Sequence, residues 1–204
     1  MALRPADHGV AASSAGGVTD FYTKLTETTI SGSSTSTVTI WAQAAWDDYD
    51  DLLIVTKTQQ TSDTNNRNHR MNMNGTTSQY ALSHNGWRTV GGAPQRIYDT
   101  SDRYFWMNDT CSGTARANSW SYGQIRIAMH KGANSNAVRP GVLMRMVSQC
   151  SDNAMSALCV AGAQYNSMDG GVSRIDIRPQ YDNIGWLNYK AGSKFTVYGL
   201  SMQG

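Results

Sequence analysis

The sequence predicts an all-β fold: an antiparallel β-sandwich or jelly-roll-like single domain that follows an extended N-terminal arm. Three observations lead to this prediction. Short segments in which apolar and polar residues alternate recur along the chain, as expected of half-buried strands. Connectors rich in Gly, Asn, Asp and Ser separate these segments and supply turns. Uncharged polar residues largely replace charge, because only 16% of the 204 residues are charged.

Nine segments carry the strand pattern. Residues 35–41, "TSTVTIW", place Val38 and Ile40 on one face. Residues 51–59, "DLLIVTKTQ", form a nearly continuous apolar run, which predicts a strand buried on both faces. Residues 42–46, "AQAAW", allow one short helical turn. The remaining strand segments are "RMNMN", "RYFWM", "GQIRIAM", "GVLMRMVSQ", "ALCVAGAQY", "VSRIDIRP" and "SKFTVYG".

The same alternation predicts the core and the position of the last strand. Residues that face one side of their segment are expected to be buried: Leu52, Ile54, Ile125, Ile127, Ile175, Ile177, Phe195 and Val197. The last segment finishes the chain with almost no tail, so we expect it at a sheet edge that meets a neighbouring subunit. The pair Gly199 and Leu200 is expected to close the core.

The chain divides into an arm, residues 1–20, and a β-domain, residues 21–204. The arm is rich in Ala, Gly and Ser and has no apolar periodicity, so it cannot bury enough surface to fold alone. We therefore expect the arm to be ordered by a neighbouring subunit and to serve as an attachment device.

Composition argues against several classes of protein. The formal net charge is only +2 and no basic run exists, so a nucleic-acid partner is not expected. No apolar stretch is long enough to cross a bilayer, so no membrane partner is expected. The N-terminus has no apolar region of a secretion signal, which predicts assembly in a cytoplasm.

The cysteines agree with a reducing compartment. Cys111, Cys150 and Cys159 are odd in number and have no C-x-x-C spacing. Buried free thiols are the favoured interpretation. Cys150 and Cys159 also suit a pair across a hairpin, and the sequence leaves that alternative open.

The residues most often used for metal binding and catalysis are scattered. The four histidines lie far apart without metal-ligand spacing, so no metal or cofactor is predicted; they are interpreted as solvated residues of the arm and of polar turns: His8, His69, His84 and His130. No nucleophile motif is present, and we expect a protein that is not an enzyme.

An acidic cluster precedes the apolar run at residues 51–59. It lacks the glycine and distal Glu of a calcium loop, and nothing pairs its carboxylates for glycosidase chemistry. We interpret its members as residues that cap and solvate the start of the strand: Asp47, Asp48, Asp50 and Asp51.

Four tryptophans in polar surroundings are the remaining candidate site residues: Trp87, Trp106, Trp120 and Trp186. Aromatic rings flanked by Asn, Asp and Gly can stack on sugar faces while amides bind hydroxyl groups. The favoured alternative is that the rings pack at subunit contacts, where Trp and Tyr are also enriched.

Three segments resemble a group of bacteriophage virion structural proteins found in phages of cyanobacteria and marine bacteria. "WDDYDDLLIVTKTQ" resembles the beginning of a strand with the pattern Y-x-D-L, and "MNMNGTTSQYALSHNG" resembles an Asn-rich turn. "SRIDIRPQYDNIGWLNYKAGSKFTVYGL" resembles the group's final G-S-x-F-x-L-Y-G-I/L strand. The match covers about residues 38–200 in order. The turn at residues 74–76 lacks the group's acidic residue, so no ion site is implied there.

The resemblance implies a non-enzymatic virion protein, assembled in the host cytoplasm. The short chain without coiled-coil heptads, together with its arm, favours a capsid decoration (cement) protein that bridges neighbouring subunits of the major capsid protein. A homo-oligomer such as a trimer is expected. The alternative is a tail-fibre or tail-tip domain that binds a host surface glycan through the four tryptophans.

Overall fold

The chain forms an all-β structure, as the sequence predicts. The computed structural model describes residues 22–32, 35–41, 46, 49–61, 68–75, 82–90, 93–102, 105–109, 120–128, 141–149, 156–165, 172–181 and 185–201. Within these ranges, strands form two antiparallel sheets and no α-helix occurs. The predicted arm, residues 1–20, lies outside the described residues, so the domain boundary stays a prediction.

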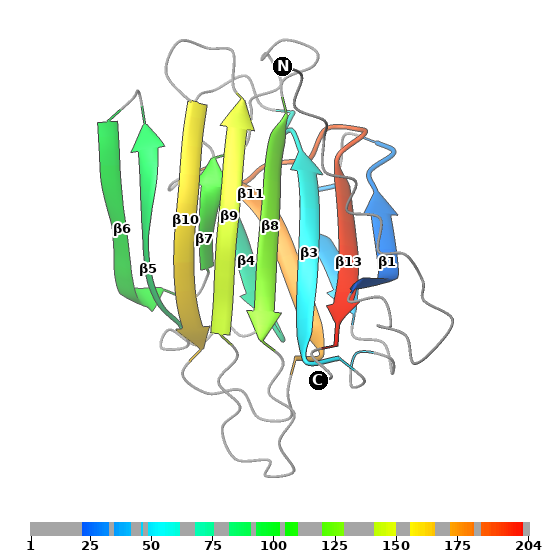
Figure 1. Cartoon of the computed structure of the whole chain (residues 1–204). Coiled ribbons are helices and arrows are strands. Elements are labelled where there is room, and N and C mark those ends of the chain that lie inside the picture. Colours follow the sequence, from blue (N-terminus) through cyan, green and yellow to red (C-terminus); the bar gives the residue numbers. More distant parts are fainter. Residues whose placement is uncertain are drawn as a thin grey trace, which may run out of the picture.

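The larger sheet has eight strands and faces the viewer in Figure 1. Its strands, from one edge to the other, are β1 (Tyr22–Thr29), β13 (Lys194–Leu200), β3 (Asp51–Thr58), β8 (Ser121–Ala128), β9 (Gly141–Gln149), β10 (Ser156–Tyr165), β5 (Leu82–Val90) and β6 (Ala93–Asp102). Every neighbouring pair is antiparallel.

The smaller sheet has five strands and lies behind the larger one (Figure 1). Its main path runs β12 (Gly185–Trp186), β11 (Arg174–Tyr181), β4 (Asn68–Met73) and β7 (Phe105–Asp109). The fifth strand, β2 (Val38–Trp41), pairs with residues 174–177 of β11. Because β12 pairs with residues 180–181, β2 and β12 follow one another along the same strand.

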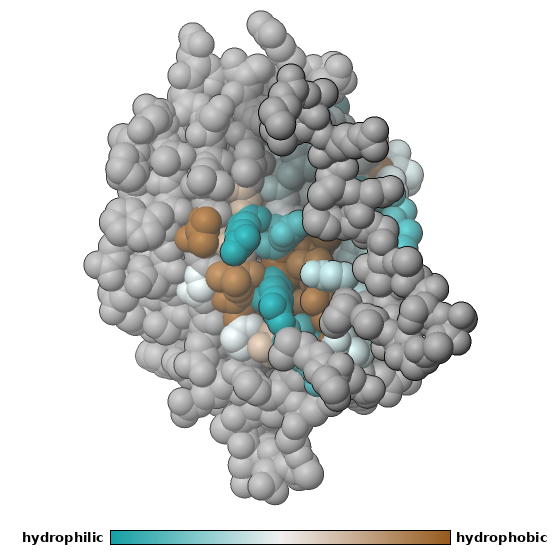
Figure 2. Space-filling view, in the orientation of Figure 1, coloured by the Kyte–Doolittle hydropathy of each residue, from teal (hydrophilic) through white to brown (hydrophobic). Residues whose placement is uncertain are grey.

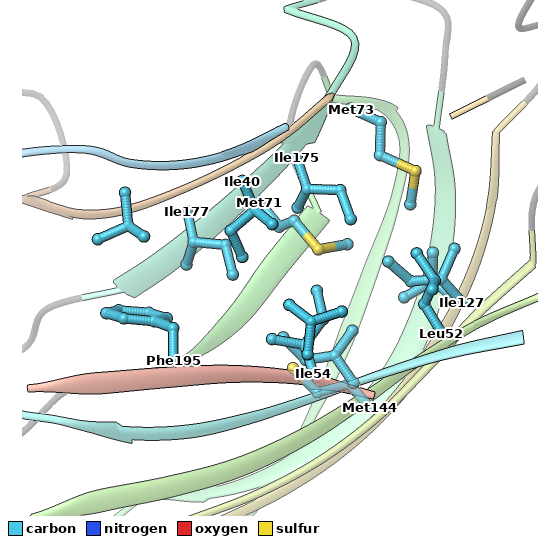
Figure 3. Packing of buried hydrophobic residues seen from close by; sticks show 14 of the residues in the cluster. Ile40, Leu52, Ile54, Met71, Met73, Ile127, Met144, Ile175, Ile177 and Phe195 are labelled. Carbon is cyan, nitrogen blue, oxygen red and sulfur yellow. The ribbon is translucent and has the colours of Figure 1, made fainter. Parts of the chain in front are cut away.

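An apolar core fills the space between the two sheets. Figure 3 shows Met71, Ile175 and Ile177 of the smaller sheet pointing toward Ile54 and Phe195 of the larger one. All eight core residues predicted from alternation are at most 1% exposed, so that prediction is confirmed. Complete burial of such a side chain contributes about 1.5–3 kcal/mol relative to exposure.

Strand β3 differs from its prediction. Leu52, Ile54 and Thr56 are buried in the core, whereas Leu53 and Val55 are only half-buried. The prediction of a strand buried on both faces is therefore wrong. At this strand, the core covers only one side of the larger sheet. The two faces of the apolar run therefore have different environments.

The last strand is also not at an edge. Strand β13 lies between β1 and β3 and is hydrogen-bonded to both. The edge beside it is β1, which carries Lys24, Glu27 and a register shift between Lys24 and Thr26. Charges and bulges on an edge strand hinder pairing with other chains. The expectation of a terminal edge strand is thus overturned by the position of β1.

Two of the segments that resemble phage proteins, residues 46–59 and 173–200, are in contact beside β13. Tyr49 precedes β3, and its ring lies against Gly199, where a Cβ atom would overlap it. The backbone N–H of Asp50 donates to the carbonyl oxygen of Leu200 at 2.9 Å. The Gly199–Leu200 pair thus anchors the residues that lead into β3, and glycine is required there by close approach rather than by backbone angle.

The Asn-rich turn after β4 is held by the third segment. Asn74 has a φ of 56° and Gly75 a φ of 63°, both in the left-handed region. The Asn74 Oδ1 accepts hydrogen bonds from the backbone N–H groups of Ser173 (2.7 Å) and Arg174 (3.1 Å). Asn tolerates the left-handed conformation better than most residues. The hydrogen bonds of its side chain tie the turn after β4 to the start of β11.

Candidate functional site

Among the described residues, the outer face of the larger sheet offers a candidate site. Strand alternation sends Ile54, Ile125 and Met144 into the core, so their neighbours along each strand face outward. Register places Val55 directly opposite Gln124, and Gln124 directly opposite Arg145. These side chains therefore form one row across β3, β8 and β9.

A groove of about 380 Å³ lies along this row. Its lining residues are Val55, Thr56, Tyr122, Gly123, Gln124 and Arg145. Figure 2 shows apolar and hydrophilic residues interleaved at the middle of this face. Tyr122 is 47% exposed, which leaves much of its side chain open to a ligand. The volume lies within the range of about 300–1,000 Å³ typical of small-molecule sites.

Gly123 shapes the sheet beneath the groove. A Cβ atom at this position would lie 2.7 Å from the Thr56 Oγ1 and 2.9 Å from the Met146 Cγ. Both side chains belong to the strands on either side, and both close over the glycine on the core side. The glycine thus lets its neighbours pack without a gap.

Most of the described cations of this face already have partners. Arg126 is paired with Asp51, and Glu27 binds both Lys24 (2.7 Å) and Lys194 (2.8 Å). Hydrogen bonds from Lys194 and Lys24 lower the pKa of the Glu27 carboxyl to about 2. In the described part of the chain, Arg145 makes no ion pair and is exposed. The groove therefore carries a guanidinium that is available to a ligand.

Lys57 and Trp120 stand beside the groove. Lys57 is opposite Tyr122 in register, and its Nζ lies 4.3 Å from the centroid of the Trp120 ring. Such a cation–π contact orients the ammonium group without neutralising its charge. Lys57 thus adds positive charge next to the Tyr122 ring.

The structure places the four candidate tryptophans on separate elements. Trp87 lies in β5 and Trp120 directly before β8, both in the larger sheet, whereas Trp106 lies in β7 and Trp186 in β12 of the smaller sheet. Strands β7 and β12 are at opposite ends of the smaller sheet's main path. The side chains of Trp87, Trp106 and Trp186 are outside the described ones, so their role in glycan or subunit contacts stays a prediction.

The acidic cluster is not simply solvated. Asp51 is 6% exposed and its carboxylate is bound by Arg126 of the neighbouring strand β8. The interpretation of Asp51 as a solvating residue is therefore wrong, because its buried carboxylate is paired with a cation of the neighbouring strand. Asp50 is half-buried, and Asp47 and Asp48 lie outside the described residues.

His69 is also not a solvated turn residue. It lies in β4, two residues before Met71 on the core-facing side, and is fully buried. Its ring packs edge-on against Tyr189 at 5.4 Å between centroids, and Tyr189 packs against Phe195 at 5.1 Å. Neither ring nitrogen has a hydrogen-bond partner among the described residues. Burial consequently lowers the pKa of His69 to about 3.

The other histidines and the cysteines add no cluster to the described part of the chain. The backbone of His84 lies in β5, and His8 and His130 are outside the described residues. The register of β9 and β10 puts Met146 opposite Cys159, and Cys111 and Cys150 are outside the described residues. In these described ranges, no three His, Cys, Asp or Glu side chains are grouped so that they could hold a metal.

Sequence reasoning missed the groove residues Tyr122, Gln124 and Arg145. Alternation in "SYGQIRIA" and "GVLMRMVSQ" already places them opposite the core positions. That signal gives the outward direction of each side chain, but it does not say that β3, β8 and β9 are neighbours.

Comparisons with protein-family models, with curated proteins and with solved structures found no match to the chain. Among the described residues, no helix is long and apolar enough to span a membrane.

Proposed function

We propose that the chain is a non-enzymatic bacteriophage virion structural protein, built as a jelly-roll β-sandwich that decorates the capsid and bridges its subunits. The observation that carries the proposal is the order of the strands in the two sheets. The resemblance of residues 38–200 to phage virion proteins supplies the biological setting.

The strand order fits a jelly roll with additions. A jelly roll takes eight strands of a chain in the orders first-eighth-third-sixth and second-seventh-fourth-fifth, an arrangement common in viral capsid and lectin domains. Here the strands β1, β13, β3 and β8 are neighbours in the larger sheet, and β2, β11, β4 and β7 are neighbours in the smaller one. Counted along the chain, these are the two orders of a jelly roll.

The additional strands broaden one sheet. Hairpin β5–β6 lies between the fourth and fifth strands of the jelly roll, and β9–β10 lies between the sixth and seventh. Both hairpins extend the larger sheet beyond β8. A broad sheet face with exposed apolar residues such as Leu143 and Val160 suits contact with a neighbouring protein.

The proposed mechanism is interfacial. The arm precedes the edge strand β1 in the chain, so it is placed to reach from the sheet edge to a neighbouring capsid subunit. Several weak contacts made at once by a homo-oligomer such as a trimer would add through avidity, and the shell would resist internal pressure.

Imaging of intact particles tests the proposal. Specific antibody fragments or a density difference map should locate copies of the protein across the whole shell, at positions that touch several capsid subunits. A few copies confined to the tail would contradict capsid decoration. Absence from purified particles would contradict a virion role altogether.

The groove favours a second candidate, a tail-fibre or tail-tip domain that binds a host surface glycan. An exposed aromatic ring beside an amide and a guanidinium is a typical carbohydrate-binding combination, and Tyr122, Gln124 and Arg145 provide it. Saturable binding on a glycan array would support this candidate. Release of reducing ends from a host polysaccharide would contradict the non-enzymatic part of both candidates.

A further inference from the structure

We infer that the groove over β3, β8 and β9 binds an acidic sugar unit, such as a uronic acid within a polysaccharide. The inference deepens the second candidate function and rests on it for the class of ligand. It is specific in two ways: it selects an anionic sugar, and it assigns binding to Tyr122, Gln124 and Arg145 rather than to the four tryptophans.

Charge is the first argument. Among the described residues, Arg126, Lys24 and Lys194 are neutralised by carboxylates, whereas Arg145 makes no ion pair. A guanidinium presents parallel N–H donors that match the two oxygens of a carboxylate. With Lys57 close by, this part of the sheet is positive and complements an anionic ligand.

The shape and chemistry of the walls supply the second argument. Tyr122 presents an exposed ring, on which the C–H face of a pyranose can pack. Gln124 lies directly between Val55 and Arg145 and offers both an acceptor and donors to sugar hydroxyl groups. One cation, one amide and one ring within a single groove match a carboxylate, hydroxyl groups and an apolar face in one sugar.

A protein partner fits the same groove less well. A specific protein interface buries about 800 Å² on each partner, and although Tyr and Arg are enriched there, a buried arginine needs an anionic partner. Here a guanidinium without an ion pair lines the groove, and burial of an unpaired charge is strongly unfavourable. The occupant must therefore bring its own anion to Arg145, in a unit small enough for about 380 Å³.

The experiment measures binding of the full chain to three polymers by titration calorimetry. Polygalacturonate carries uronic acids, dextran is a neutral sugar polymer, and poly-L-glutamate is a polyanion without sugar. The variants are Arg145→Gln and Tyr122→Ala, and Lys24→Gln is the matched control because it removes one charge from the same face at the edge strand β1. Each variant is checked for an unchanged melting temperature, since all three side chains are exposed.

The expected result is saturable binding to polygalacturonate that Arg145→Gln and Tyr122→Ala each weaken by about tenfold or more, with Lys24→Gln within about twofold of the wild type. Equal binding to dextran would overturn the acidic specificity while supporting the glycan function. Equal binding to polyglutamate would overturn the sugar. Binding that survives both groove substitutions would overturn the assigned site. No binding to any of the three polymers would overturn this inference, and the glycan array would then decide the second candidate function separately.

Discussion

Tyr49 and Gly199 show how single residues join distant parts of this chain. The glycine belongs to β13 and the tyrosine precedes β3, and the ring occupies the space where any other residue would place its Cβ. Close packing leaves no room to absorb an added methyl group without movement of the ring. The contact therefore joins residues 46–59 to residues 173–200 through one ring and one glycine.

We expect Gly199→Ala to lower the free energy of unfolding by about 1–3 kcal/mol, the usual effect of overpacking. Urea denaturation followed by circular dichroism measures the change. Combining Gly199→Ala with Tyr49→Ala removes the obstructing ring, so the alanine should then have little further effect. A full additive loss in the double variant would show that the ring is not the cause.

His69 makes stability depend on pH. The unfolded chain binds a proton at this residue below pH 6.5, its ordinary pKa, whereas the folded protein does so only near pH 3, because burial disfavours the cation. Acid therefore favours the unfolded state. The ring that packs against it is that of Tyr189, whose hydroxyl group is neutral at these pH values and does not compensate the charge.

Above pH 6.5 we expect His69 not to change the free energy of unfolding. Between pH 6 and pH 4 the free energy of unfolding should fall by up to about 1.4 kcal/mol per pH unit. Urea titrations at several pH values measure the slope. His69→Gln should flatten the slope whatever its effect on stability at pH 7. The interval from pH 6 to pH 5 is the most informative, because Glu27 adds its own acid dependence only below its ordinary pKa of 4.5. Equal slopes would contradict the assignment to His69.

For single residues, the sequence predicts burial where burial depends on the alternation of side chains along a strand. Ile125 and Ile127 are buried as expected, because a strand sends every second side chain to the same face. The same rule was available for His69, which stands two residues before Met71. Its interpretation as a solvated residue rests on the polar surroundings "RNHR", and local polarity is a poor guide where both sheets cover a position.

Hairpin β5–β6 forms the end of the larger sheet beyond β10. Within the described sheets, it is hydrogen-bonded to the rest of the fold only through the pairing of β5 with β10. Its ends lie side by side, because Leu82 pairs with Asp102, so a short linker can replace it. Hairpin β9–β10 has paired ends as well, Gly141 with Gln164, but it contributes Val142, Met144 and Met146 to the core.

We expect replacement of residues 82–102 by a short Gly-Ser linker to leave a cooperatively folded protein. The same replacement of residues 141–164 should abolish cooperative folding. It removes buried side chains, and it leaves hairpin β5–β6 without a strand that connects it to the rest of the larger sheet. Thermal melting and dispersion of amide resonances compare the two proteins. If removal of β5–β6 unfolds the chain as completely, the hairpin belongs to the cooperative core.

Strands with one buried face could be found from the sequence, whereas strands without one could not. In β1 no residue is buried, and the segment "YTKLTETT" shows no apolar alternation. Segments β5 and β6 are polar too, and neither is among the nine segments that carry the strand pattern. Such strands form because a neighbour offers hydrogen bonds, and that neighbour is distant in the sequence.

For the whole molecule, we expect deletion of residues 1–20 to leave the β-domain folded. The segment lacks the apolar surface to contribute to a core, and the first described strand begins at Tyr22. The deletion should weaken incorporation into particles, because an arm ordered by a partner contributes binding that is then lost. Occupancy of truncated and full-length protein on particles that lack it, compared after washing, measures the effect.

Two results would contradict this role of the arm. Equal occupancy would make the arm a passive tail and would assign attachment to the sheet face. Failure of the truncated protein to fold would mean that the arm pairs with a sheet, and that the boundary at residue 21 is misplaced.

The interior position of β13 also sets the timing of folding. During synthesis β1 leaves the ribosome before the other described strands, yet its described strand partner is β13, the last of them. Until β13 is synthesised, β1 lacks its strand partner, and the backbone groups of β3 that bind β13 are unpaired. The nascent chain therefore exposes an apolar strand that can pair with other chains. Closure of the larger sheet joins segments from opposite ends of the chain, which is slow. A product that stops before Lys194 would therefore lack the strand that joins β1 to β3.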